Sequence, residues 1–367
     1  MAEEKERVYN FSAGPAMLPR EVLETAAKEM LSFRGSGMSF MECSHRGAEF
    51  KALYAELQER TRRVLKIPDN YSVLFCAGGA THQFAYIPLN LCGPEDVIDV
   101  VQTGNWSKKF AEEAGRYCKI NIASKSSDFI PAVETWKLTE GAKFIYFCDN
   151  ETIHGVEFPE VPKVPEDRIL IADMSSNLFS RPVDISKFGL LYACAQKNFG
   201  PAGCTLVIVR NDLIVGGPKQ ADKCPIVGGY ELLKKKDSAY NTPPTYNMYI
   251  INLVLKWIEE TIGGLDKMAE INAKKADLLY KYIDESEHWS GIAKPEFRSR
   301  MNIPFRCTHD DMQAKFLEYC KPRGLITLKG YRTMVGSFRA SIYNAMPLRG
   351  VEKLVEAMKD FERDMKF

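Results

Sequence analysis

The stretch "LLYACAQKNFGPAGCTLVIVR", residues 190–210, places one lysine between two apolar runs. Both runs are short, almost free of polar residues and separated by a glycine–proline turn, a pattern typical of strands that are buried on both faces. Lys197 therefore falls at the tip of a predicted strand. Partial desolvation there makes its amine available as a nucleophile toward carbonyl groups, and a lysine that reaches out to solvent is the alternative interpretation.

Similar apolar runs recur upstream and alternate with longer stretches of helical period. They are "YSVLFCAG" (71–78), "DVIDVVQTG" (96–104), "KFIYFCDN" (143–150) and "RILIADMSS" (168–176). This alternation predicts an α/β fold with a mainly parallel central sheet flanked by helices. We expect an N-terminal segment over 1–20, a large α/β domain over 21–260 and a smaller C-terminal α+β domain over 261–367. The break is expected at Gly263 and Gly264.

The composition excludes several classes of function. The 367-residue chain carries a formal charge of +1, so no broad field favours nucleic acid or an anionic membrane. No segment approaches 18 uninterrupted apolar residues, and the charged start is unlike a secretory or organellar leader. Ten cysteines without a CxxC pair favour reduced thiols over a disulfide framework or a zinc ribbon. We expect a cytoplasmic globular protein with no membrane or nucleic-acid partner.

A pair of glycines follows the first of these runs. Gly78 and Gly79 precede a predicted helix start, where free N–H groups and the helix dipole favour a phosphate. Neither GxGxxG nor GxxxxGK[ST] occurs in the chain, which disfavours a dinucleotide fingerprint and a P-loop. A plain strand-to-helix turn is the alternative interpretation of the glycines.

Asp173 ends the run "ILIAD", and a buried carboxylate needs a cation or hydrogen-bond donors. It suits a metal ligand, a structural acid or the partner of a cationic heterocycle, but no cluster with ligand spacing supports a metal. A phosphate cradle, Asp173 and Lys197 together match the needs of pyridoxal phosphate. In that arrangement Trp106 stacks on the ring, and Thr152 hydrogen-bonds its exocyclic oxygen.

Together these stretches resemble the phosphoserine aminotransferases, fold-type I pyridoxal-phosphate enzymes of the class V aminotransferase group. The resemblance runs nearly end to end and adds several motifs to those above. They are "NFSAGPAMLP", "SHRGAEF" (44–50), "GGATHQF", "TGNWS", "NETIHGVEF", "ADMSSN", "AQKNFGPAG", "YNTPPTY" (240–246) and "GSFRASIYNA".

The resemblance implies a role for each matching residue around the cofactor. Lys197 is the lysine that binds the cofactor covalently, Asp173 the partner of the pyridine nitrogen, and Trp106 the stacking residue, all three catalytic. The implied cofactor-binding residues are Gly79, Ala80, Thr81, Trp106, Thr152, Asp173, Gln196, Lys197, Asn241 and Thr242. In this family the last two reach the phosphate from the neighbouring subunit, so the resemblance implies a homodimer. It implies no metal.

The resemblance also implies the substrates and their contacts. The reaction is ping-pong transamination between glutamate and 3-phosphohydroxypyruvate, giving O-phosphoserine and 2-oxoglutarate in serine biosynthesis. Arg339 binds the α-carboxylate, whereas His45, Arg46 and Arg332 surround the distal anion, for which arginine is well suited. The chain departs from the family pattern at Tyr331, where a histidine is usual, and its Arg332-to-Arg339 spacing is one residue longer.

Three other interpretations compete with this one. A cysteine desulfurase needs a mobile cysteine, commonly in the C-terminal domain, but the chain has none after Cys320. A dehydrogenase explains the sheet and the glycine turn but not the pairing of Asp173 with Lys197. A catalytically dead interaction protein has no need to retain Lys197, Asp173 and Arg339.

Overall fold

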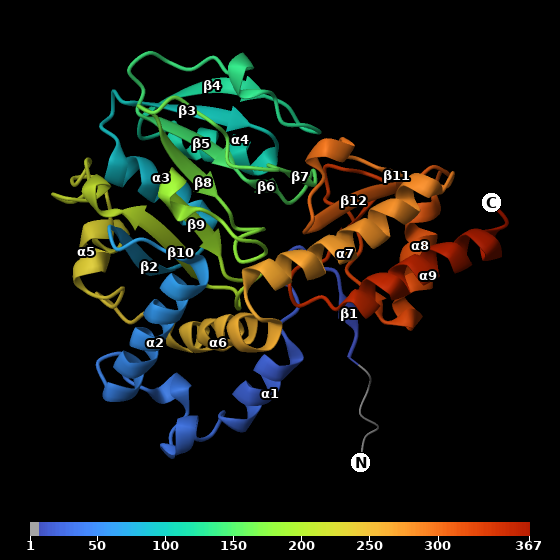
Figure 1. Cartoon of the computed structure of the whole chain (residues 1–367), viewed down its shortest axis with the longest axis horizontal. Coiled ribbons are helices and arrows are strands. Elements are labelled where there is room, and N and C mark those ends of the chain that lie inside the picture. Colours follow the sequence, from blue (N-terminus) through green and yellow to red (C-terminus); the bar gives the residue numbers. More distant parts are fainter. Residues whose placement is uncertain (1–6) are drawn as a thin grey trace.

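A seven-stranded sheet lies at the centre of the large domain (Figure 1) in the computed structural model, which describes residues 7–367. The strands, in spatial order, are β2 (Tyr71–Ala77), β10 (Cys204–Arg210), β9 (Phe188–Cys194), β8 (Ile169–Asp173), β5 (Phe144–Cys148), β3 (Val97–Gln102) and β4 (Lys119–Lys125). Only β10 runs against the other six, because it is antiparallel to both β2 and β9. The mainly parallel sheet predicted from the sequence is confirmed. Residues 1–6 of the predicted N-terminal segment lie outside the described residues.

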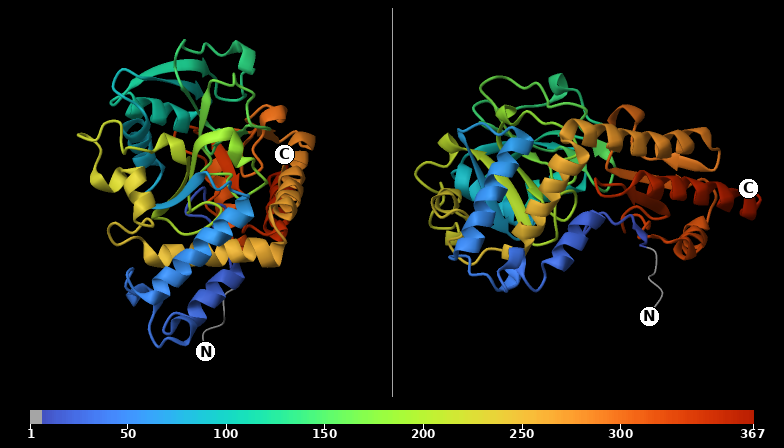
Figure 2. Two further views of the ribbon diagram at one scale, coloured as in Figure 1. Left: turned by 60° about the vertical axis from the view of Figure 1, so that its left-hand side comes forward. Right: turned by 60° about the horizontal axis from the view of Figure 1, so that its bottom comes forward.

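Helices cover both faces of this sheet because its side chains alternate between them. Val73 and Phe75 of β2 pack in the cluster that includes α1 (Arg20–Lys28), α2 (Ala48–Leu65) and α6 (Thr245–Lys256). Leu74 and Cys76 pack on the other face. The helices there are α3 (Ala80–Leu91), α4 (Asn105–Ala114) and α5 (Tyr230–Lys235). Figure 2 shows the same layers from two further directions.

The edge strand β4 was not predicted. Its sequence "KINIASK" alternates polar and apolar residues, and only Ala123 in it is fully buried. An edge strand lacks a neighbour on one side, so it does not need the continuous apolar run that identifies the inner strands.

A smaller domain follows the large one. Its three-stranded sheet has the order β11 (Trp289–Gly291), β12 (Asn302–Cys307) and β14 (Ser337–Ser341). Its helices are α7 (Leu265–Glu285), α8 (Met312–Cys320) and α9 (Leu348–Met365). A π-helical turn, Trp257–Ile262, and then Gly263 and Gly264, with φ of 89° and 98°, separate α6 from α7. One helix ends and another begins at these glycines, and the domain boundary at this position stays a prediction.

The N-terminal segment packs on the small domain. Strand β1 (Tyr9–Asn10) pairs in parallel with β13 (Leu325–Ile326), and Phe11 is fully buried in the core of that domain. The sequence motifs did not predict this pairing, because its two strands are only two residues long and lie more than 300 residues apart.

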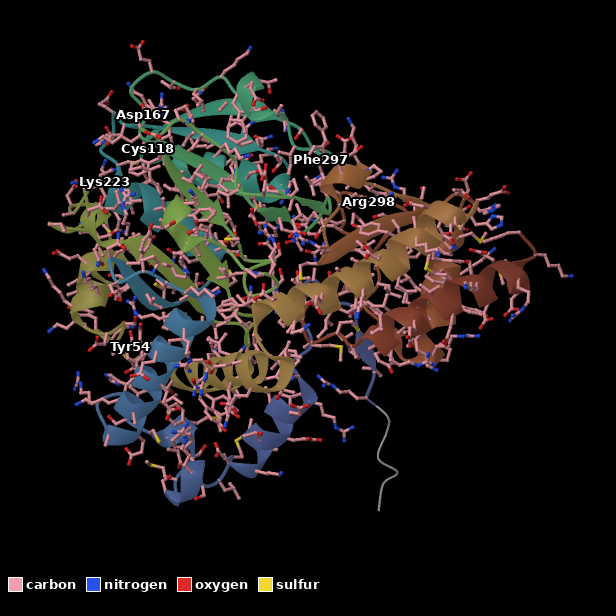
Figure 3. The ribbon with its side chains drawn as sticks, in the orientation of Figure 1. Tyr54, Cys118, Asp167, Lys223, Phe297 and Arg298 are labelled. Atoms are coloured by element: carbon pink, nitrogen blue, oxygen red, sulfur yellow. The ribbon has the colours of Figure 1, made fainter. Side chains whose placement is uncertain are left out.

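The two domains meet along the hairpin of β6 (Asn150–Glu151) and β7 (Val156–Glu157). Phe297 and Arg298, both labelled in Figure 3, lie at this junction, and Arg298 forms a β-bridge with Val156. Gly155, with φ of 68°, leaves no room for a side chain, because a Cβ there would lie 2.3 Å from Pro304 Cδ. The hairpin therefore ties the small domain to the end of β5. Within residues 7–367 no helix is long and apolar enough to cross a membrane.

Candidate active site

A cavity of about 320 Å³ lies where the parallel strands end and the small domain begins. This is the edge at which open parallel sheets bind their ligands. Nine of the residues predicted for the site line the cavity: Gly79, Ala80, Thr81, Trp106, Thr152, Asp173, Gln196, Lys197 and Arg339. They come from the segments after β2, β3, β5 and β9, the last residue of β8, and the strand β14.

Lys197 lies in the turn that follows β9, just beyond the strand tip where the sequence placed it. Its Nζ donates a hydrogen bond of 2.8 Å to Thr152 Oγ1 and lies 5.8 Å from the centre of the Trp106 ring. The amine is therefore held between a hydroxyl and an aromatic face. The side chain is half-buried, so a ligand can still reach it.

Asp173 lies on the floor of the cavity and is 3% exposed. One carboxylate oxygen accepts a hydrogen bond of 2.9 Å from the backbone N–H of Ser175. Beneath it, the hydroxyls of Tyr146 and Tyr192 lie 2.9 Å apart. Burial, and then the charge of Asp173, raises the pKa of both tyrosines well above the ordinary value, so they stay neutral under this carboxylate.

The first turn of α3 forms one end of the cavity. Gly78 has φ of 99°, and a Cβ there would lie 1.9 Å from His82 Nδ1, so only glycine fits this turn. The N-cap residue Gly79 contributes no side chain, and the N–H of Ala80 points to Cys194 Sγ at 3.0 Å. Helix dipole and backbone N–H groups here suit an anion, as the sequence predicts.

Four buried polar atoms of residues that line the cavity have no hydrogen-bond partner among the described residues: Trp106 Nε1, Asn150 Oδ1, Gln196 Oε1 and Arg339 Nε. Such atoms are rare in folded proteins, and a cluster of them indicates a missing partner. An amine, an acid, an aromatic face, a hydroxyl and a helix N-terminus around one cavity are the donor set that a phosphorylated, charged heterocycle requires. The residues present fit pyridoxal phosphate.

Arg339 is the contribution of β14 to the cavity. Burial lowers the pKa of its guanidinium, and no ion pair in the described part of the chain includes it. A half-buried cation without a carboxylate partner is prepared to bind an anionic ligand. Tyr331 also lines the cavity, whereas the guanidinium of Arg332 is exposed and lies 5.9 Å from the Tyr331 ring.

Five predicted site residues do not line this cavity: His45, Arg46, Asn241, Thr242 and Arg332. Arg46, Thr242 and Arg332 are exposed, and Asn241 lines a different cavity of about 190 Å³ beside His82. The structure of one chain therefore brings together the predicted cofactor pocket without these side chains.

Sequence reasoning missed other residues that line the cavity, among them Gly14, Asn150 and Ser175. Asn150 and Ser175 each come shortly after the end of a parallel strand, β5 and β8. The expectation that polar residues at strand ends form the site, which identified Asp173, could therefore have found them. Gly14 belongs to the motif "NFSAGPAMLP", and a Cβ on it would lie 3.6 Å from Lys197 Cγ. No local signal in the sequence indicates that contact.

The model of the aminotransferase class-V family matches residues 8–354. The chain belongs to this family. It is 47% identical to a phosphoserine aminotransferase from Janthinobacterium sp. (strain Marseille), with 97% of this chain and 99% of the relative covered. A PLP-bound phosphoserine aminotransferase from Trichomonas vaginalis matches with a TM-score of 0.91 and 46% identity, covering 96% of this chain and all of the other.

A phosphoserine aminotransferase from Bacillus circulans subsp. alkalophilus matches with a TM-score of 0.94 and 43% identity. It covers 98% of this chain and 100% of that one. These matches confirm the family resemblance and the predicted fold. They also exclude a dehydrogenase, because the class-V family model and the solved aminotransferase structure both match nearly the whole chain.

Proposed function

We propose that this class-V aminotransferase is a phosphoserine aminotransferase, which exchanges an amino group between glutamate and 3-phosphohydroxypyruvate. The products are 2-oxoglutarate and O-phosphoserine, in serine biosynthesis. One observation carries the proposal: Lys197, Thr152, Trp106, Asp173 and Arg339 line one cavity. The relatives of this chain, at about 47% identity over nearly its full length, are phosphoserine aminotransferases.

The cofactor is pyridoxal 5′-phosphate. When bound, it supplies the electron sink that lets an amino acid lose its α-proton. Gly79, Ala80 and Thr81 at the start of α3, together with Gln196, hold the phosphate. No group of three or more His, Cys, Asp or Glu residues suited to a metal ion occurs within residues 7–367.

Four side chains of the cavity have separate roles in the proposed reaction. Lys197 binds the cofactor and, when released, its amine moves the proton at the substrate α-carbon. Thr152 Oγ1 accepts a hydrogen bond of 2.8 Å from that amine, and its hydroxyl would hydrogen-bond the exocyclic oxygen of a bound cofactor. Asp173 holds the proton on the pyridine nitrogen, because a buried carboxylate favours a nearby positive charge. Trp106 covers the ring and excludes water.

Arg339 holds the α-carboxylate of either substrate. It is the half-buried, unpaired guanidinium in the cavity, and a planar two-donor group matches a carboxylate. His45, Arg46 and Arg332 take the distal phosphate or γ-carboxylate. Tyr331 also lines the wall of this cavity.

The active unit is a homodimer with sites at its interface. This proposal is supported by four predicted site residues that do not line the cavity of their own chain: His45, Arg46, Asn241 and Thr242. A second copy that brings Asn241 and Thr242 to the phosphate completes the cofactor site without any change in the fold.

The protein works in the cytoplasm. Supporting this proposal, all ten cysteines are free thiols, and eight of them are buried. Free thiols persist where the surroundings are reducing, whereas disulfides form and persist in oxidising compartments.

The proposed function is tested by adding amino acids separately to the purified protein and recording its visible absorbance. Glutamate and phosphoserine should bleach the band of the bound cofactor, while alanine should leave it unchanged. The absence of any cofactor band after incubation with pyridoxal phosphate contradicts the cofactor assignment. A band that responds to alanine but not to phosphoserine contradicts the substrate assignment.

A further inference from the structure

Glu151 is a fully buried acid beside the cavity that the proposed chemistry leaves without a role. It belongs to β6 and lies between Asn150 and Thr152, which both line the cavity. Its carboxylate points away from them, toward the start of α4. There Oε1 accepts hydrogen bonds from Ser107 N at 2.8 Å and Ser107 Oγ at 2.7 Å, and Oε2 accepts one from Trp106 N at 3.0 Å.

These bonds replace the missing cap of α4. The residue at the N-cap is Gly104, which has no side chain to accept the free N–H groups of the first turn. A Cβ on Gly104 would lie 2.5 Å from Glu151 Cδ, so the absence of a side chain makes room for the acid. Gly104 and Glu151 therefore form one unit although they come from different segments.

The negative charge of Glu151 is balanced by the helix rather than by a cation. None of the ion pairs among residues 7–367 includes it, and the positive end of the α4 dipole lies at its oxygens. Burial raises the pKa of Glu151, while the N–H groups of Ser107 and Trp106 act in the opposite direction. The acid is thus bound to the first turn of α4 by geometry and by charge.

That first turn carries Trp106. The Trp106 ring faces Lys197 at 5.8 Å, while Thr152, next to Glu151 in the chain, accepts the hydrogen bond from the same lysine. A shift of Glu151 therefore moves both neighbours of Lys197 together. Both carboxylate oxygens of Glu151 are hydrogen-bonded to the first turn of α4. The acid is therefore not directed at the substrate or the cofactor.

We propose that Glu151 is a positioning residue. It fixes Trp106 through the first turn of α4 and Thr152 through the backbone of β6, so that both side chains are correctly placed for the cofactor. This inference rests on the proposed function for its catalytic consequence. Its structural part, the placement of Trp106, does not.

The test compares Glu151→Gln with Asp99→Asn. Glutamine has the same shape, but its NH₂ group faces an N–H or a hydroxyl donor of α4 and must move away from it. Asp99 is a matched control, because it is also 0% exposed and accepts bonds from Thr139 N at 3.0 Å and Asn121 Nδ2 at 2.8 Å. It lies on β3 outside the lining of the cavity.

The first readout uses the protein without cofactor. The emission of Trp106, taken as the difference between each protein and its Trp106→Phe counterpart, should shift in Glu151→Gln and stay at the wild-type value in Asp99→Asn. With cofactor, Glu151→Gln should bind pyridoxal phosphate about tenfold more weakly. Its kcat should fall by about a hundredfold, as expected for a displacement of about 1 Å near the reacting atoms. KM should change little, since Arg339 is untouched.

A folded Glu151→Gln protein with wild-type Trp106 emission and cofactor affinity overturns the proposal. If Glu151→Gln does not fold, Glu151→Asp decides, because it keeps the charge but is one methylene too short to bond both N–H groups. Glu151→Asp should shift the same two signals, and wild-type values for both would overturn the proposal. If wild-type protein binds no cofactor, the proposed function fails, and the Trp106 emission still tests the placement.

Discussion

Lys197 Nζ donates its hydrogen bond to Thr152 Oγ1, and this contact of 2.8 Å joins the turn after β9 to the loop after β5. The two residues follow strands that are separated by β8, whose last residue is Asp173. The amine, the hydroxyl and the acid therefore lie at the ends of three adjacent strands. The surroundings of Lys197 therefore depend on the order of the strands in the sheet and not on the conformation of a single loop.

Replacing Lys197 should abolish turnover without unfolding the protein. We expect Lys197→Ala to lower kcat by at least about 10⁴-fold, since both the covalent anchor and the proton carrier are lost. Lys197→Arg is the matched control that keeps the charge but not the chemistry, and it should be equally inactive. Steady-state kinetics and circular dichroism measure the two effects. Measurable wild-type activity in either variant contradicts the assigned role.

Replacing Asp173 by asparagine should weaken catalysis more than cofactor binding. The neutral amide cannot hold the proton on the pyridine nitrogen, so we expect kcat to fall by about 10²-fold to 10⁴-fold. Because Asp173 is buried and its environment is already polar, the fold should persist. Rates with glutamate are compared with those of Asp173→Glu, which should recover part of the loss. Equal rates for the asparagine variant and the wild type would rule out this role.

Arg339→Lys should impair substrate binding. Lysine keeps the charge but loses the planar pair of donors, so kcat/KM should fall by about tenfold to a hundredfold, mainly through KM. The exposed Arg349, which pairs with Glu352 and Glu356 on α9, provides the control. Arg349→Lys should leave KM for glutamate and phosphoserine unchanged. An unchanged KM in Arg339→Lys would show that the α-carboxylate binds elsewhere.

Mixed dimers should test whether Arg46 serves the site of the other chain. Lys197→Ala and Arg46→Ala should each be impaired when expressed alone. In a mixed dimer, the site that retains Lys197 receives an intact Arg46 from the partner, so co-expression of differently tagged chains should recover activity at one site. Activity of the purified mixed dimer is the measurement. No recovery above the two single variants would place Arg46 in the site of its own chain.

Lys275 should give the stability of the protein a distinctive dependence on pH. This lysine of α7 is fully buried and donates to the carbonyls of Ile342, Tyr343 and Met346 at 2.8–3.0 Å. Burial lowers its pKa to about 7. Between that value and its ordinary pKa of about 10.4, the unfolded chain binds a proton that the folded chain does not.

The free energy of unfolding should therefore rise with pH from about 7 toward 10, because the unfolded state holds more protons there. Below pH 7 both states are protonated, and this contribution is constant. Lys275→Met removes it, so the difference in unfolding free energy between wild type and variant should change across this window. Urea unfolding at several pH values measures it. A difference that is independent of pH would contradict the lowered pKa.

Nine predicted site residues line one cavity because they lie next to strong local signals in the sequence. Asp173 and Lys197 terminate or follow apolar runs, and the parallel arrangement of those runs places their ends together. The antiparallel direction of β10 could not be predicted, since a fully buried strand has the same composition in either direction.

Residues that act through three-dimensional proximity escaped prediction. Glu151 reaches α4 across 44 positions of sequence, and no periodic signal in the sequence indicates this contact. Arg332 was predicted to bind the distal anion, yet its neighbour Tyr331 lines the cavity of this chain and Arg332 does not. Sequence spacing states which residues are close along the chain, whereas side-chain direction within a loop depends on packing.

The pairing of β1 with β13 has a consequence for how the protein is made. Gly14, at which a Cβ would lie in ordinary contact with Lys197 Cγ at 3.6 Å, follows a strand whose partner ends at Ile326. During synthesis the first residues must therefore wait until nearly the whole chain has left the ribosome. The pocket is completed by a contact of very large sequence separation, which forms slowly because its loop-closure entropy is high. A nascent chain of this protein can form its sheet early, whereas the segment that carries Gly14 takes its place at the cavity only after β13 has been made.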